Sequence, residues 1–179
     1  RDSVASRGLG DVYKRQTRLR ETAFLNAGLK ITIIDQRGKK PETVEHQYDG
    51  GISEFVKQLN DRRNPIHSDV IYIKGMREIE DGEIHVEMAM QWSDAYNEVI
   101  QCYTNIIRNR DGGTHLSGLR SALTGSLNRY AKSRNLLKNV DKLSGDDVRE
   151  GIAVVISVKH PAPSFSSQTK DKLVSNEVA

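Results

Sequence analysis

A chain of 179 residues is long enough for one ordinary domain, or for one domain and part of another, and it can bury a hydrophobic core. Hydrophobic residues make up 36% and charged residues 28%, and a mean hydropathy of −0.59 is typical of a soluble globular chain. No apolar run approaches the roughly 18 residues of a membrane span, so no membrane partner is expected. The one cysteine, Cys102, excludes an internal disulfide and fits a cytoplasmic protein.

The excess of basic residues is concentrated at the start of the chain. The net charge is +3 and the pI is near 9.0, but residues 1–16 (RDSVASRGLGDVYKRQ) hold four basic and two acidic residues. The remaining 23 basic and 22 acidic residues nearly cancel, so bulk charge neither supports nor excludes a nucleic-acid partner. Residues 1–16 also resemble a translated sequencing adaptor, and we expect them to be a disordered artefact. A natural disordered tail is the alternative.

The first regular segments predict a helix, a hairpin and a second helix. Residues 17–27 are rich in helix formers, and Gly28 follows where a helix end favours a left-handed residue. Residues 29–33 alternate apolar and polar side chains as a strand does, and QRGKKP at 36–41 predicts a hairpin turn. The apolar residues of 52–59 then recur at helical spacing.

The polar segment NDRRNP at 60–65 ends in proline and marks a candidate domain boundary. Beyond it the chain predicts a sheet. Residues 70–73 are β-branched or aromatic, and residues 84–92 place an apolar side chain at every second position. The dipeptide DG at 81–82 predicts the turn before this strand, and residues 96–107 predict the next strand.

A long helix is predicted after the glycine-rich break DGGT at 111–114. Five residues at three- and four-residue spacing predict its buried stripe: Leu116, Leu119, Leu123, Leu127 and Tyr130. Arg120, Thr124 and Asn128 form a polar stripe beside it. Residues 129–142 are basic and unpatterned, which predicts a loop.

The last segments complete the predicted layer. Ser144 and Asp147 have the spacing of a capping box for one short helix, which Gly151 ends. The run IAVVISV at 152–158 is almost continuously apolar, which is typical of a central strand covered on both faces. Residues 160–170 are rich in proline and serine and predict a loop. A sheet with one long helix and one buried strand gives an α+β fold.

Two features could carry chemistry in a sequence that has no CxxC, HExxH, GxGxxG or Walker A motif. Residues 111–115 (DGGTH) precede a helix, where backbone amides and the helix dipole could receive an anion; the alternative is a plain helix start capped by Thr114. Gln168 and Lys170 could both reach a phosphate, and the alternative is a solvated loop lysine. No metal site is expected.

Six stretches, in this order, resemble the B subunits of bacterial DNA gyrase, which is a type IIA topoisomerase. They are RLRETAFLNAG at 18–28, GGI at 50–52, MQWSDAYNE at 90–98, GGTHLSGLRSALT at 112–124, GDDVREGIAVVISVK at 145–159, and SSQTKDKL ending at Leu173. Together they cover essentially all of residues 17–179. The B subunit of topoisomerase IV shares GGTH and QTK, whereas QWSDAYNE and GDDVREGIAVVISVK look more like gyrase.

The resemblance implies a layout of two parts. Residues 17–64 would be the C-terminal part of a GHKL ATPase domain. Residues 65–179 would be a transducer domain of ribosomal-protein-like βαβ fold, incomplete at its C-terminus. The family's general base, its Mg²⁺-binding asparagine and its glycine-rich lid precede this stretch, and its DNA-cleavage metal domain follows. We therefore expect a fragment with no catalytic residue, whose Mg²⁺ ligands lie outside it.

The resemblance also implies roles for three residues. In the family, the QTK loop reaches the nucleotide, so Lys170 would contact the γ-phosphate of ATP and Gln168 would support it. Arg120, in GGTHLSGLR, would face double-stranded DNA. Leu119 and Val174 depart from the family's usual residues, but neither lies at a proposed contact.

The function implied is a relay that carries ATP binding and hydrolysis to the strand-passage gate of a cytoplasmic topoisomerase. Its implied cofactor is ATP with Mg²⁺. Its implied partners are the gyrase A subunit, double-stranded DNA, and a second B subunit with which it dimerises on ATP binding. Two alternatives stay open: a topoisomerase IV B subunit, or a freestanding α+β binding module.

Overall fold

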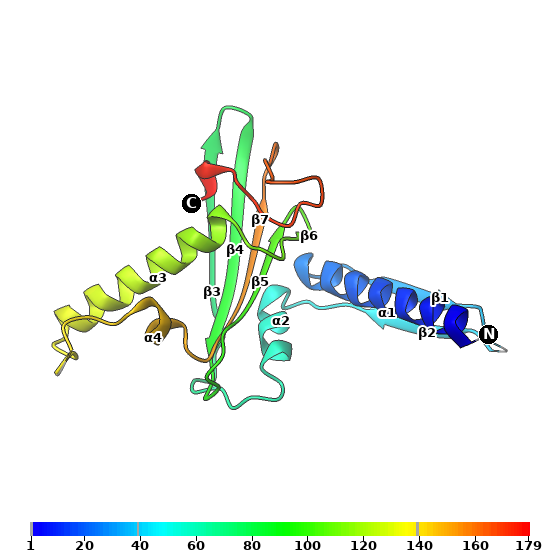
Figure 1. Cartoon of the computed structure of the whole chain (residues 1–179), viewed down its shortest axis with the longest axis horizontal. Coiled ribbons are helices and arrows are strands. Elements are labelled where there is room, and N and C mark those ends of the chain that lie inside the picture. Colours follow the sequence, from blue (N-terminus) through cyan, green and yellow to red (C-terminus); the bar gives the residue numbers. More distant parts are fainter. Residues whose placement is uncertain (1, 39, 139) are drawn as a thin grey trace. The chain divides into compact units, whose positions relative to one another are not determined.

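The computed structural model describes residues 2–38, 40–138 and 140–179, with side chains from residue 12 onward (Figure 1). The chain forms two compact units, one ending at Phe55 and the other beginning at Val56. Helices and sheets are both present, which confirms the predicted α+β class. Within the described ranges, no helix is both long and apolar enough to cross a membrane.

The first unit contains the predicted helix and hairpin. Its elements are α1 (Asp2–Leu25), β1 (Ile31–Asp35), β2 (Glu42–His46) and the start of α2 (Ile52–Leu59). The strands pair antiparallel across the expected turn, with Asp35 opposite Glu42. The buried Phe24 ring stacks on Tyr48 and Phe55, with centroids 3.5 and 4.7 Å away. These ring contacts hold α1 against α2 within this unit.

Residues 2–16 are helical where disorder was expected, because α1 extends back to Asp2, while residue 1 lies outside the described residues. The helix is continuous through Thr17, whose hydroxyl donates to the Tyr13 carbonyl 3.0 Å away. Extending an existing helix adds a backbone hydrogen bond for each residue without a new nucleation step. The adaptor origin of this segment stays a prediction.

The second unit is a five-stranded sheet of order β3-β4-β7-β5-β6 with helices attached. Its strands are β3 (Ile71–Ile79), β4 (Gly82–Trp92), β5 (Val99–Thr104), β6 (Ile107–Arg108) and β7 (Ile152–Lys159), and its helices are α3 (Thr114–Ser133), α4 (Gly145–Arg149) and the single 3-10 turn η1 (Asn176–Val178). Strand β7 pairs antiparallel with β4 and parallel with β5. The chain between β5 and β7 contains α3, so these elements form a βαβ crossover.

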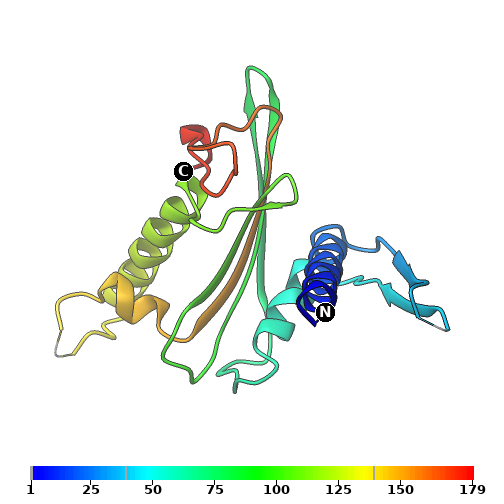
Figure 2. The same ribbon diagram turned by 45° about the vertical axis from the view of Figure 1, so that its right-hand side comes forward.

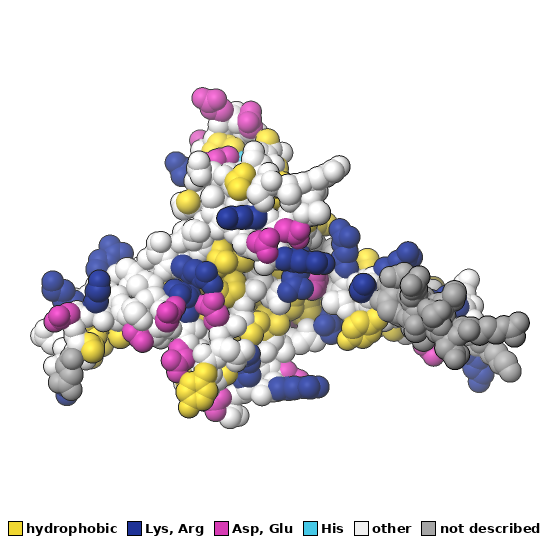
Figure 3. Space-filling model, viewed as in Figure 1, with side chains coloured by type: hydrophobic (Ala, Val, Ile, Leu, Met, Phe, Trp, Pro, Cys, Tyr) yellow, Lys and Arg dark blue, Asp and Glu magenta, His cyan; other side chains and the backbone are white. Residues whose placement is uncertain are grey.

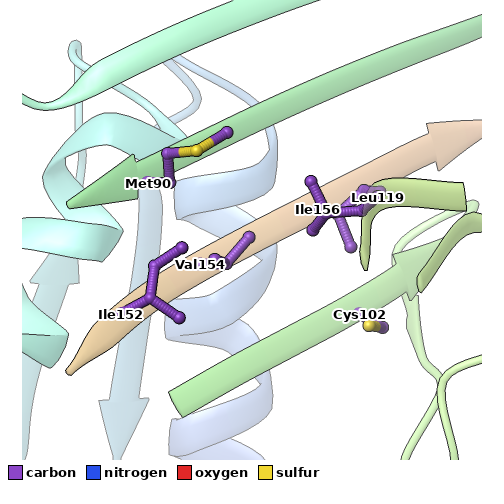
Figure 4. Close-up of a cluster of buried hydrophobic side chains, with 6 residues drawn as sticks. All are labelled: Met90, Cys102, Leu119, Ile152, Val154 and Ile156. Carbon is purple, nitrogen blue, oxygen red and sulfur yellow. The ribbon is translucent and has the colours of Figure 1, made fainter. Parts of the chain in front are cut away.

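The core lies between the sheet and α3, as the hydrophobic pattern predicts (Figure 2). Its buried side chains come from β4, β5, β7 and α3 and are drawn in Figure 4: Met90, Cys102, Leu119, Ile152, Val154 and Ile156. All residues of β7 from Ile152 to Val158 are buried, which confirms the predicted central strand. Burial raises the pKa of the Cys102 thiol to about 12, so this residue acts as a small apolar side chain.

Two predictions about α3 and its surroundings are wrong in part. The spacing of Tyr130 predicts a place on the buried stripe, but this residue is 57% exposed because the C-terminal half of α3 diverges from the sheet (Figures 1 and 2). The loop predicted from residue 129 begins later, because α3 continues to Ser133. Asn135, with φ of 52°, takes the left-handed conformation after the helix end.

The strand predicted over 96–107 is also interrupted. Asn105 and Ile106 have φ values of 47° and 61°, which form a two-residue hairpin turn between β5 and β6. The Asn105 side chain fixes this turn to the neighbouring backbone. It donates to the His160 carbonyl at 2.8 Å and accepts from the His160 amide at 2.9 Å. These paired bonds favour a turn that the β-branched Ile106 disfavours by itself.

The short helix α4 begins and ends as predicted. Ser144 and Asp147 form the reciprocal capping box, with hydrogen bonds of 3.1 and 2.8 Å. Gly151 follows with φ of 71°, and a Cβ there would lie 2.3 Å from the Ser93 carbonyl oxygen. This glycine therefore lets the chain turn tightly into β7.

We predict that Gly151→Ala lowers the free energy of unfolding by several kcal/mol, because it adds both a left-handed alanine and a clash with backbone. The matched control is Gly125→Ala on α3, where an added Cβ meets no atom within 4 Å. That variant should be stabilised by up to about 1 kcal/mol through helix propensity. Urea unfolding of both variants is the measurement, and equal effects would contradict the prediction.

A second prediction concerns His115, which is buried on the first turn of α3 with no hydrogen-bond partner for either ring nitrogen among the described residues. Burial lowers its pKa to about 4, so the unfolded chain binds this proton first as the pH falls below about 6.5. The resulting loss of stability should reach about 2 kcal/mol near pH 5.

This pH dependence is measured by urea unfolding between neutral and mildly acidic pH. His115→Phe should remove most of the slope in that window, whereas His85→Gln, at an exposed position of β4, should keep it. A slope unchanged by His115→Phe would show that another group titrates.

Candidate functional site

The loop that carries Gln168 and Lys170 is a short hairpin-like turn. Its base is an antiparallel bridge between Phe165 and Leu173, and the Ser166 amide donates to the Lys172 carbonyl at 3.0 Å. Gln168 and Lys170 are both exposed at its tip, and Lys170 has a φ of 60°. We call residues 165–173 the tip hairpin.

The base of the tip hairpin is bonded to the start of α3. The Leu173 amide donates to the Gly112 carbonyl at 3.0 Å, and the Leu173 carbonyl accepts from the Thr114 amide at 3.1 Å. At Gly113, a Cβ would lie 2.2 Å from the Leu173 carbonyl oxygen. Gly113 therefore permits the close approach of the two backbones, whereas Gly112, with a φ of 66°, takes a left-handed conformation in which a Cβ would meet the Leu116 side chain.

This packing corrects the reading of DGGTH from the sequence. The helix cap is Gly113, and Thr114 is the first helical residue, whose hydroxyl donates to the Ser175 carbonyl at 2.6 Å. The Thr114 amide already donates to the Leu173 carbonyl, so this first amide of the helix is not available to an anion. The glycines of this motif are structural, and Gly113 serves a tertiary contact instead of a plain helix start.

A buried polar chain fixes the backbone at Lys170. The Asn109 side chain donates to the Lys170 carbonyl at 2.7 Å and accepts from the Thr104 hydroxyl at 2.6 Å. Asn109 and Thr104 are both buried, and the Asn109 amide bonds to the Cys102 carbonyl at 2.8 Å. Sequence reasoning missed Asn109, because its partner lies 61 residues further along the chain.

The side chains at the hairpin tip are free to meet a ligand. The Lys170 ammonium lies 5.7 Å from the centroid of the Phe165 ring, within cation–π range. It forms no ion pair with any residue in the described part of the chain, and the Gln168 side chain is exposed on the same hairpin. An exposed ammonium and an exposed amide on one tip could bind an anionic group such as a phosphate.

Arg120 lies on the second turn of α3, partly exposed to solvent and already paired with a carboxylate. Its Nη2 atom is 2.5 Å from Oε1 of Glu98, and its side chain is 40% exposed. The other oxygen of Glu98 is 3.0 Å from Nε of Arg149, whose Nη2 is 2.7 Å from Asp146. Sequence reasoning missed Glu98 and Arg149, which lie 51 residues apart.

The structure brings Gln168 and Lys170 together on one hairpin and places Arg120 on the helix that this hairpin joins. Thr114 and Arg120 are six residues apart, or about 9 Å along the helix axis. No group of three or more potential metal-ligand side chains occurs among the residues that the structure describes. The face shown in Figure 3 has both signs of charge scattered over it.

Comparisons with known proteins give this geometry a family. A sequence model of DNA gyrase B matches residues 51–179. The DNA gyrase B subunit of Rickettsia bellii is 49% identical over 162 residues, and that of Chlamydia pneumoniae is 47% identical over 163. Each match covers 90% of this chain and 20% of the relative. The chain thus spans about a fifth of the length of these curated relatives.

Solved structures agree with the sequence relatives. The 43K ATPase domain of Thermus thermophilus gyrase B, determined with an aminocoumarin, has a TM-score of 0.78 and 37% identity, and the match covers 93% of this chain and 43% of that one. The topoisomerase IV ATP-binding domain of Francisella tularensis has a TM-score of 0.71 at 23% identity and shows the fold alone. With relatives almost half identical across nine tenths of its length, this chain belongs to the DNA gyrase B family.

Proposed function

We propose that this chain works as part of the B subunit of an ATP-dependent type IIA DNA topoisomerase, and that it relays nucleotide state to the strand-passage gate. Residues 17–64 would end a GHKL ATPase domain, and residues 65–179 would form most of a transducer domain. Membership of the gyrase B family and the likeness to a gyrase ATPase domain support this layout. The catalytic residues for ATP hydrolysis and DNA cleavage would lie elsewhere in the full-length protein.

The observation that carries the proposal is the bonded junction between the tip hairpin and α3. Leu173 pairs with Gly112 and Thr114 through main-chain hydrogen bonds, and Thr114 opens the helix on which Arg120 lies. Main-chain hydrogen bonds are short and directional. A displacement of the tip hairpin would therefore displace the first turn of α3 as well. A relay from a nucleotide contact to a DNA-facing side chain needs such a junction.

In this proposal the tip hairpin senses ATP. Lys170 would contact the γ-phosphate and Gln168 would support it, while the Mg²⁺ ion bound with ATP would be held by residues outside this chain. Bound ATP would supply the γ-phosphate that ADP lacks. A charge-assisted contact made only with that group favours one conformation over another, which a relay requires.

The DNA-facing side of the relay would be Arg120, as a contact to the phosphates of a duplex. The remaining partners we propose are a second B subunit, which dimerises on ATP binding, and the gyrase A subunit, in the cytoplasm. Gyrase is favoured over topoisomerase IV because the relatives with 47–49% identity are gyrase B subunits. That same identity argues against a freestanding binding module.

We predict that Lys170→Ala lowers ATP hydrolysis and DNA supercoiling roughly tenfold to hundredfold, as expected for loss of a charge-assisted contact. The measurement uses a chimera in which residues 17–179 replace the matching stretch of Rickettsia bellii gyrase B, assayed with gyrase A. Lys172→Ala is the matched control, since it removes an exposed lysine from the same hairpin. Near-wild-type activity of Lys170→Ala would refute the sensing role.

A second prediction concerns DNA. Arg120→Ala should weaken binding of the chain to a labelled DNA duplex, and the slope of log affinity against log salt should flatten by about one. Fluorescence anisotropy over a range of salt concentrations measures both effects. Lys74→Ala removes one exposed cation from β3 and should leave both nearly unchanged. Identical binding by Arg120→Ala and the unmodified chain would rule out the DNA-facing role.

A further inference from the structure

Glu98 lies just before β5 and is shared between two arginines. Its Oε1 atom is 2.5 Å from Nη2 of Arg120, and its Oε2 atom is 3.0 Å from Nε of Arg149. Each carboxylate oxygen therefore has its own cation. The carboxylate links α3, which carries Arg120, to α4, which carries Arg149.

The two arginines are held to different degrees. Arg149 is only 17% exposed and has a second carboxylate partner, since its Nη2 atom is 2.7 Å from Asp146. Arg120 is 40% exposed and pairs with Glu98 alone among the described acidic residues. Its Nε atom is buried without a hydrogen-bond partner in the described part of the chain. Of the two arginines that pair with Glu98, Arg149 is therefore held more firmly than Arg120.

We propose that Glu98 is a built-in counter-ion that competes with DNA phosphate for Arg120, and that Arg149 retains Glu98 when Arg120 turns to the phosphate. This inference rests on the proposed DNA-facing role of Arg120. It gives Glu98 the role of a positioning residue that sets how tightly the chain holds a duplex.

The exchange is physically inexpensive in this arrangement. Ion pairs that are partly exposed are weak, because water screens them and two long side chains lose freedom. The phosphates of a duplex form a denser array of negative charge than one carboxylate, and binding to them releases counter-ions. Glu98 does not become an unpaired charge afterwards, because Arg149 stays beside it.

Glu98 also acts on the phosphate directly. A carboxylate left near a bound phosphate repels it, so Glu98 opposes DNA binding both before and after Arg120 moves. The consequence is weaker retention of the duplex at this position. A protein that must release a transported duplex benefits from such an opposing charge.

The test is the affinity of the full 179-residue chain for a short fluorescein-labelled DNA duplex, measured by anisotropy. Glu98→Gln should raise the affinity roughly threefold to tenfold, because it removes the competing charge. In the Arg120→Ala background, Glu98→Gln should give a clearly smaller gain, since only the direct repulsion of the phosphate is relieved and no arginine is freed. Circular dichroism of each variant checks that the fold is retained.

The matched control is Glu150→Gln, which changes the charge equally next to Arg149 but forms no ion pair with either arginine in the described ranges. A gain from Glu98→Gln no larger than that from Glu150→Gln would overturn the role of Glu98 and leave the DNA-facing role of Arg120 intact. If Arg120→Ala itself leaves the affinity unchanged, the DNA-facing role fails, and the competition proposal fails with it.

Discussion

Two backbones approach each other at the start of α3 more closely than any side chain would allow, and the candidate site depends on this approach. Gly113 leaves room for the Leu173 carbonyl, and the hydrogen bonds of Gly112 and Thr114 then join the tip hairpin to the helix. The junction fixes where the hairpin tip stands relative to α3. The buried Asn109 adds a second hydrogen bond, to the Lys170 carbonyl. The tip hairpin is therefore bonded to the rest of the unit both at its base and at Lys170.

The two cations of the proposed relay are held in opposite ways. Lys170 lies exposed over an aromatic ring without a carboxylate partner among the described residues, so an incoming anion meets no internal competitor. Arg120 is already paired with Glu98, so its partner must be exchanged. A sensor that must distinguish one phosphate group benefits from an available charge. A contact to DNA phosphate that must form and break as a duplex moves benefits from an arginine that already has a carboxylate partner, because the contact is then weaker.

Local patterns predicted much of the fold. The continuous apolar run of β7 requires burial on both faces, and the capping box of α4 involves residues only three apart, so both were readable from the sequence. The break between β5 and β6 was not, because the turn depends on Asn105 bonding to His160, 55 residues away. The buried stripe of α3 failed at Tyr130, because helical spacing does not reveal where a helix leaves its sheet.

The candidate site also contains residues that the sequence could predict and residues that it could not. The roles proposed for Gln168, Lys170 and Arg120 come from short stretches that resemble a known family, whereas the residues that hold them could not be predicted in this way. Asn109 and Glu98 are ordinary polar residues in sequence, and only the folded chain brings each to its distant partner. The wrong prediction of Thr114 as a helix cap has the same cause, since the carbonyl that accepts from the first amide of α3 belongs to the distant Leu173.

The position of β7 has a consequence for how this unit is made. Strands β4 and β5 follow one another in the chain, yet they are not neighbours in the sheet, because β7 lies between them. During synthesis the ribosome releases both strands, and all of α3, before the strand that separates them exists. Their edges must stay apart until β7 emerges, so the sheet closes late and by insertion. A nascent chain at that stage exposes two unpaired strand edges, which can pair with other chains and aggregate.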